Sequence, residues 1–116
     1  MATVSLIGVD GQPLTSAVLS SAAGGDITGV AATAAKFTRI YKLFLVVTGA
    51  TVITFKDGTT ALSGAMALPA NGAIILDLDG QPWFVTSKNS AFLINSSAAT
   101  QVSGTLYYTQ TNYGYI

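Results

Sequence analysis

The chain has 116 residues, half of them apolar and only 9% charged, with five Lys or Arg against five Asp and no Glu. This length predicts one domain with a real core, and the mean hydropathy of +0.54 is high for a chain that stands alone in water. The balanced charge gives no field that would attract nucleic acid or an anionic membrane, so we expect neither as a partner. Because the chain has no Cys and no His, it can form no disulfide, no thiolate or histidine metal site, and no Cys-His pair or Ser-His-Asp triad.

The N-terminal third predicts one strand followed by a segment of small residues. Residues 3–7 favour a first strand, which ends at the turn sequence Asp-Gly-Gln-Pro of residues 10–13. Residues 14–35 are mostly Ser, Ala, Gly and Thr, which bury too little area to offset the entropy of ordering. We therefore expect residues 14–35 to be a flexible arm or a long loop, in which the glycines act as linker residues.

Residues 37–55 form the stretch around which the other elements are organised. They predict two strands joined by a turn that contains glycine. The second strand alternates cleanly, with Ile53 and Phe55 on one face. The first strand instead has large apolar side chains on both faces between Leu43 and Val47, so it needs a cover on each side. We expect another copy of the chain to supply one of those covers.

The rest of the chain has the pattern of short strands separated by turns. Asp-Gly and Pro-Ala-Asn-Gly sequences mark the turns, and no segment outside residues 14–36 has a helical period. The expected strands lie at residues 60–68, 73–78, 83–85, 92–94 and 105–109. In total the sequence predicts about eight short antiparallel strands, a pattern typical of a β-sandwich or barrel, and we expect an all-β fold with a single β-sandwich over residues 1–116.

Asp77 and Asp79 are the strongest candidates for chemistry, because residues two apart on a strand project to the same face. Two carboxylates there could act as an acid–base pair or bind calcium, but a calcium loop of this kind needs more oxygen ligands and a closing Glu. We expect both to be structural residues where a strand runs into a turn. The sequence thus predicts no catalytic residue, no metal site, no cofactor and no enzyme.

Three other patterns allow both a structural and a functional interpretation. Residues 95–97 (Asn-Ser-Ser) match the glycosylation acceptor pattern, and we favour a polar loop. Lys36, Arg39 and Lys42 form the one basic cluster, which we expect at solvated strand edges, with contact to an acidic partner as the alternative. The tyrosines of the last strand and tail can be interface or core aromatics, or they can stack on sugars or bases.

Between about residue 42 and residue 110 the order of turns and strands forms a pattern. It consists of a TFKDGTTALSG hairpin, a Pro-Ala-Asn-Gly turn, a strand that enters the aromatic pair Trp83-Phe84, and a final GTLYYT strand. This part of the chain resembles a group of small bacteriophage virion proteins. The resemblance implies a small all-β module, often jelly-roll-like, of the kind found on capsids or tails as decoration (cement) proteins or fibre domains.

The function that this resemblance implies is that of a non-enzymatic structural protein on the capsid surface of a phage virion. Decoration proteins commonly sit as trimers at capsid symmetry axes, so we expect a homo-oligomer, with a trimer favoured, bound to the major capsid protein or another virion protein. A tail or fibre module that contacts the host is one alternative, and a carbohydrate-binding module that uses Trp83 and the C-terminal tyrosines is another. The residues expected at the oligomer or capsid interface are Leu43, Leu45, Val47, Tyr107, Tyr113 and Tyr115.

Overall fold

The computed structural model describes residues 13–77 and 81–112, in which ten strands form two antiparallel sheets. The first sheet has the order β1, β10, β3 and β7, and β8 also pairs with β3; the strands are Thr15–Ser21 (β1), Val102–Thr111 (β10), Phe37–Val47 (β3), Ala73–Asp77 (β7) and Phe84–Val85 (β8). The second sheet has the order β2, β9, β4 and β5, and β6 also pairs with β4; the strands are Gly25–Val30 (β2), Phe92–Ser96 (β9), Thr51–Asp57 (β4), Thr60–Ala61 (β5) and Met66–Leu68 (β6). The expected all-β sandwich is confirmed. The strand expected at residues 3–7 lies outside the described residues.

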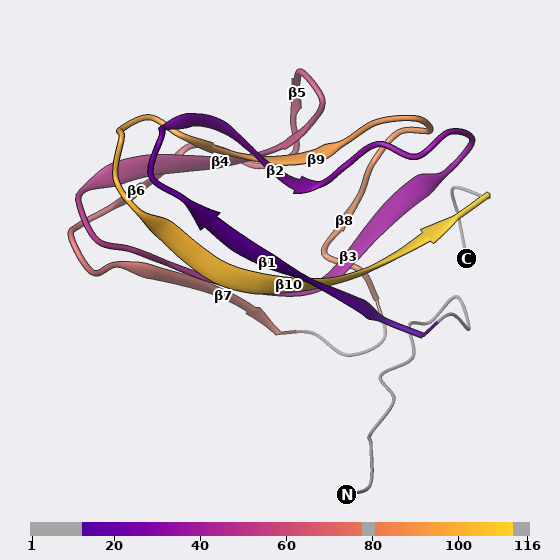
Figure 1. Ribbon diagram of the computed structural model, residues 1–116, viewed down its shortest axis with the longest axis horizontal. Helices are drawn as coiled ribbons and strands as arrows, with labels where there is room; N and C mark the ends of the chain where they lie inside the picture. Colours follow the sequence, from indigo (N-terminus) through magenta and orange to yellow (C-terminus); the bar gives the residue numbers. More distant parts are fainter. Residues whose placement is uncertain (1–12, 78–80, 113–116) are drawn as a thin grey trace, which may run out of the picture.

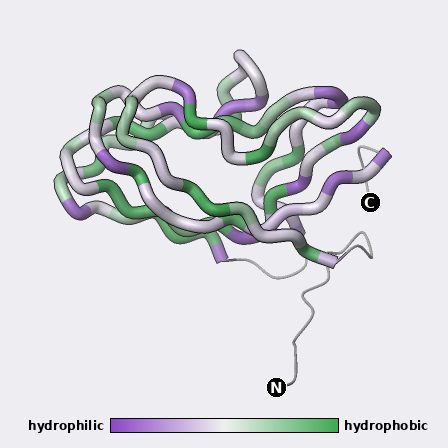
Figure 2. The backbone as a smooth tube through the Cα atoms, viewed as in Figure 1, coloured by the Kyte–Doolittle hydropathy of each residue, from purple (hydrophilic) through white to green (hydrophobic). Residues whose placement is uncertain are grey.

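The two sheets pack face to face as two layers, with β2, β9 and β4 in the upper layer of Figure 1 and β1, β10, β3 and β7 in the lower. Their facing side chains form the core, and the alternation of apolar and polar residues along the strands is visible in Figure 2. In β4, Ile53 and Phe55 point inward and are buried, as their period of two predicts. Figure 1 also shows that β1 and β2 lie at the same side of the sandwich, one in each layer.

An aromatic cluster fills one part of the core. The ring centroids of Phe55 and Phe84 are 5.2 Å apart, and Phe92 lies 5.8 Å from each of them. These distances are typical of aromatic pairs that add to the stability of a core. The cluster joins β4 and β9 of the second sheet to β8 of the first, so it holds the two layers together.

From Leu43 to Val47 the strand β3 has one face in the core and one face in solvent. Leu43, Leu45 and Val47 point inward and are fully buried, whereas Phe44 and Val46 point outward. The inward set includes three of the expected interface residues, and that expectation is wrong for them. The second sheet of the same chain already covers their side chains, so they are not available to a partner.

The segment 14–35 is not a loop or an arm, because most of it forms the edge strands β1 and β2. The strand β1 pairs with β10 over seven consecutive residues, and Leu19 is buried. The strand β2 pairs with β9 and buries Ile27 and Val30. Small residues can form these strands because β10 and β9 supply partners for their backbone hydrogen bonds. These hydrogen bonds and the burial of a few apolar side chains offset the entropy lost on ordering.

Gly24 and Gly25 are turn residues rather than linker residues. They connect β1 to β2 with φ angles of 75° and 73°, in the region that residues with a Cβ rarely adopt. This turn carries the chain from the first sheet to the second. Across residues 13–77 and 81–112, the fold has no helix long and apolar enough to cross a membrane.

Candidate binding surface

The outer face of the first sheet carries a row of side chains that runs across four strands. The pairing register places Val18 of β1 opposite Thr105 of β10, Thr105 opposite Phe44 of β3, and Phe44 opposite Ile75 of β7. We call Val18, Thr105, Phe44 and Ile75 the central row. The side chains of direct cross-strand neighbours lie close enough to touch. Three of the four are large apolar residues, and they are 80% (Val18), 48% (Phe44) and 72% (Ile75) exposed.

Two polar or small rows flank the central row. On one side the register aligns Ser16, Tyr107, Lys42 and Asp77, and on the other it aligns Ser20, Ser103, Val46 and Ala73. Val46 is 42% exposed and lies next to the central row, so it extends the apolar surface along β3. The face therefore has an apolar centre with one charged border and one border of small residues.

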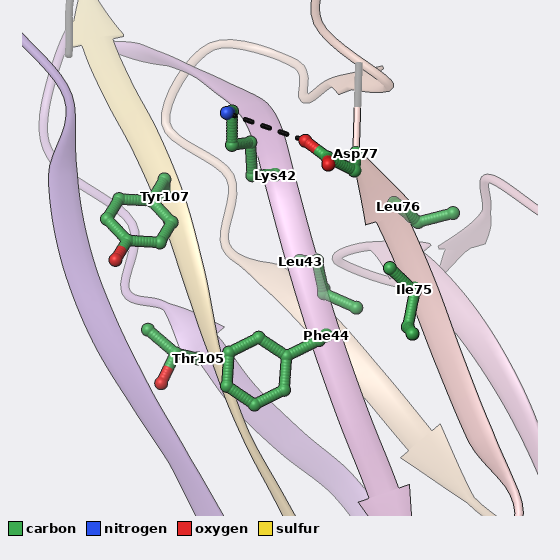
Figure 3. A pocket seen from close by; sticks show the side chains of 8 residues that line it. All are labelled: Lys42, Leu43, Phe44, Ile75, Leu76, Asp77, Thr105 and Tyr107. Atoms are coloured by element: carbon green, nitrogen blue, oxygen red, sulfur yellow. Dashed lines mark ion pairs between the residues drawn. The ribbon is translucent and has the colours of Figure 1, made fainter. Parts of the chain in front are cut away.

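A shallow hollow of about 320 Å³ lies on this face between β10, β3 and β7. Its lining residues are Lys42, Leu43, Phe44, Ile75, Leu76, Asp77, Thr105 and Tyr107. Figure 3 shows Tyr107 and Phe44 standing on neighbouring strands, with Thr105 beside the Phe44 ring. Of the tyrosines expected at an interface, Tyr107 is half-buried and lies on this surface, while Tyr113 and Tyr115 fall outside the described residues.

An ion pair closes the charged end of the hollow. The Nζ of Lys42 lies 3.4 Å from an Oδ of Asp77, and the two residues are opposite each other in the β3–β7 pairing (Figure 3). Asp77 is therefore a strand residue that faces an ammonium group. Asp79 lies outside the described residues. Within those residues no cluster of three or more acidic side chains could hold a metal ion.

The basic cluster that the sequence suggested is not brought together on one solvated edge. Arg39 is 0% exposed, so its expected position at a solvated strand edge is wrong. Its guanidinium donates a hydrogen bond to the hydroxyl of Thr111, across the β3–β10 pair. The pairing of β3 with β10 shifts by one residue at Tyr41. On the N-terminal side of this shift, where Arg39 lies, both faces of β3 are buried.

The outer face of the second sheet is polar by contrast. Asp26 of β2 accepts hydrogen bonds from Lys56 Nζ (3.1 Å) and from the amide of Asn95 (2.8 Å). The hydrogen bonds from Asn95 and Lys56 hold the pKa of Asp26 below its ordinary value. Asn95 thus has a structural partner on β2 and belongs to strand β9, not to the polar loop that was expected.

A second acidic residue is fixed by hydrogen bonds near the end of β4. The Oδ2 of Asp57 accepts bonds from the backbone N–H (2.8 Å) and the hydroxyl (2.7 Å) of Ser87. Partial burial raises the pKa of Asp57, but the hydrogen bonds from Ser90 and Ser87 lower it by more, and the net pKa is below the ordinary value. This carboxylate ties β4 to the segment after β8.

The outer face of the first sheet is the candidate binding surface among the described residues. The outer face of the first sheet offers exposed apolar side chains, one ion pair and a shallow hollow. Sequence reasoning missed Val18, Phe44, Val46 and Ile75 as its main residues. For Phe44 and Val46 a signal existed, because they alternate with Leu43, Leu45 and Val47 and must face the opposite way. Comparison with family models, with curated proteins and with solved structures finds no match.

Proposed function

We propose that the chain is a non-enzymatic structural protein of a phage virion, a capsid decoration (cement) protein that attaches to the capsid surface as an oligomer. The observation that carries this proposal is the exposed apolar row on the outer face of the first sheet. In most antiparallel sheets an outer face is polar, as it is in the second sheet here. A contiguous apolar patch on such a face marks a site of contact with another macromolecule.

The composition of the outer face resembles that of a protein–protein interface. Aromatic and large aliphatic side chains, Phe44, Ile75 and Val18, lie in one row across the face, and the Lys42–Asp77 pair lies in the neighbouring row. A partner that covers the central row would remove three large apolar side chains from water. It would leave the ion pair at the edge, where charges need not lose their hydration. A capsid protein with an apolar groove or ridge fits this pattern.

The strand order supports a jelly-roll form of the sandwich, as the sequence resemblance implies. The pairs β1–β10, β2–β9, β3–β7 and β4–β6 are nested, and they alternate between the two sheets. A long antiparallel hairpin that is rolled into two sheets has this order, which is characteristic of jelly rolls. Jelly rolls occur in viral capsid and lectin domains, so the architecture agrees with the proposal.

The number of copies in each virion distinguishes a decoration protein from its nearest alternative. Quantitative mass spectrometry of purified particles would measure this number directly. We expect a few hundred copies, in keeping with a protein that covers a capsid lattice. A handful of copies would instead identify a tail or fibre module, and the complete absence of the chain from particles would refute a virion role.

A pair of matched variants tests whether the outer face makes the contact. Ile75→Lys places a charge in the central row, and Thr28→Lys places the same charge on an exposed strand position of the second sheet. We expect particles to lose the Ile75→Lys protein and to retain the Thr28→Lys protein, because a buried unpaired ammonium is costly at an interface. Equal retention of both would show that the capsid contact lies elsewhere.

A carbohydrate-binding role is the second candidate, and the position of two aromatic residues favours it. Trp83 is 42% exposed just before β8, and Tyr107 lines the hollow next to an ion pair that could hydrogen-bond sugar hydroxyls. Binding of the wild-type chain to a glycan array, and loss of that binding in Tyr107→Ala, would support this role. No binding to any glycan would leave the structural role as the better explanation.

A further inference from the structure

The edges of the two sheets differ in how well they are protected against pairing with another chain. Within the described ranges the sandwich has four edges, formed by β1 and by β7 with the two-residue β8 in the first sheet, and by β2 and the short pair β5 and β6 in the second. An edge strand presents unpaired N–H and C=O groups, and natural proteins block such edges with charges, bulges, prolines or very short strands. An edge that lacks these features is a place where a further strand can be added.

Three of these edges carry such protection. The pairing of β2 with β9 is irregular between Thr28 and Val30, and β2 also carries the charged Asp26. The strand β7 has five residues and ends in the charged Asp77. The strands β5 and β6 have only two and three residues. Each of these features disfavours pairing of that edge with another strand.

Within its bounds, Thr15–Ser21, the strand β1 has none of these protective features. Its seven residues, TSAVLSS, include no charge and no proline, and its register with β10 is continuous from Thr15 to Ser21. At its centre Val18 is 80% exposed, a position where an isolated chain gains nothing from a large apolar side chain. The free edge of β1 is therefore the unprotected edge of the described fold.

We propose that β1 pairs with β1 of a second copy of this chain, antiparallel and about a two-fold axis at Val18, so that the two first sheets become one continuous sheet. Two-fold pairing places each strand against itself, and the residues of β1 suit that arrangement. Val18 would face the partner subunit's Val18, and Ser16 would face the partner subunit's Ser20. No charge would meet a like charge, because β1 has none.

The same pairing would also join the apolar surfaces of the two copies. The central row ends at Val18 on the β1 side. Antiparallel pairing at Val18 brings the two central rows end to end on one face of the joined sheet, because cross-strand partners share a face. The inferred dimer thus presents a docking surface twice as long as that of one chain. This inference concerns contact between copies and does not depend on what the outer face binds.

Charge variants on β1 test the pairing and its register. Ser16 and Ser20 are exposed, and Ser20 accepts one surface hydrogen bond from Gln101 (3.1 Å). The double variant Ser16→Lys, Ser20→Lys would place ammonium groups opposite each other at both ends of the pairing. The variant Ser16→Lys, Ser20→Asp removes the same hydrogen bond but places each ammonium opposite a carboxylate. Opposite charges on paired strands stabilise and like charges destabilise.

Size-exclusion chromatography with light scattering at micromolar concentration measures the result. We expect twice the mass of the 11.8 kDa chain for the wild type and for the Lys/Asp variant, and the mass of one chain for the Lys/Lys variant. A Ser16→Asp, Ser20→Asp variant should also be monomeric alone and should form mixed dimers with the Lys/Lys variant. A wild-type monomer, a wild-type trimer, or a Lys/Lys variant that stays dimeric would overturn the proposal.

Hydrogen exchange provides a second measurement that needs no variant. The amides of β1 that point away from β10 should be protected in concentrated wild-type protein and should exchange rapidly once dilution separates the copies. If dilution lowers the molecular mass measured by light scattering but leaves the protection of these amides unchanged, pairing at this edge is refuted. The Ile75→Lys variant should keep the dimer mass, so failure of the capsid contact and failure of the β1 pairing remain distinguishable.

Discussion

Lys42 of β3 and Asp77 of β7 are direct partners in the antiparallel pairing, and the Nζ of Lys42 lies 3.4 Å from the Oδ1 of Asp77. This relationship brings together two residues that the sequence analysis singled out separately, one as an acidic candidate and one as a member of the basic cluster. The carboxylate of Asp77 lies beside the ammonium group of Lys42. Lys42 faces the neighbouring strand rather than a basic patch.

The first prediction is that Asp77→Asn lowers stability only slightly. Asp77 has 70% of its side chain exposed, and exposed ion pairs contribute about 0–1 kcal/mol, screened further by salt. We expect the melting temperature, measured by calorimetry, to fall by a few degrees at most and the loss to shrink at high salt. If calcium raised the melting temperature of the wild type but not of Asp77→Asn, a metal site would have to replace this interpretation.

The second prediction concerns the dependence of stability on pH. The pKa values of Asp57 and Asp26 are lower in the folded chain than the ordinary value of 3.8, so the unfolded chain binds protons more readily in acid. Their contribution to stability is complete above pH 3.8 and is lost as the pH falls through the lower folded values. Urea unfolding at a series of acidic pH values should show this decline.

The matched control for the pH series is Asp57→Asn, which keeps the shape of the side chain but does not titrate. The variant should be less stable at neutral pH, because the Ser87 hydrogen bonds lose a charged acceptor. Its stability should also fall less steeply in acid than that of the wild type. An unchanged slope would mean that Asp57 has no lowered pKa in the folded chain.

The third prediction separates the two faces of β3. Leu45 is 0% exposed, so Leu45→Ala should leave a cavity and lower the free energy of unfolding by about 2–5 kcal/mol. Phe44 is half-exposed, and Phe44→Ala should lower it by less than about 1 kcal/mol. Chemical denaturation of both variants at one concentration measures the difference. Similar losses for the two would show that Phe44 is covered in the protein as it exists in solution.

The fourth prediction concerns the strands that replace the expected arm. Because β1 and β2 pair with β10 and β9, the amides that point toward those partners should exchange slowly in the free protein. Hydrogen exchange with mass spectrometry should therefore show protection in residues 15–21 and 25–30, less than in β3 because edge strands have one solvent-facing side. Exchange within seconds throughout both segments would restore the mobile arm.

The sequence alone determined the fold class and many of the inward-facing residues. Ile53 and Phe55 in β4, and Phe92 and Ile94 in β9, are buried as their alternation predicts. In β7, Ile74 packs against the core. These features are readable because a period of two is a local property of a strand, and each of these strands needs only one apolar face.

The tertiary structure alone decided which segments meet and which face of each strand is covered. Residues 15–30 form strands because distant segments offer them backbone partners, which no local composition reveals. Leu45 and Phe44 are adjacent apolar residues of β3. Only the position of the second sheet determines that Leu45 is buried and Phe44 is exposed. The central row brings together residues 18, 44, 75 and 105 through three strand registers, and a register is a relation between strands that no single strand encodes.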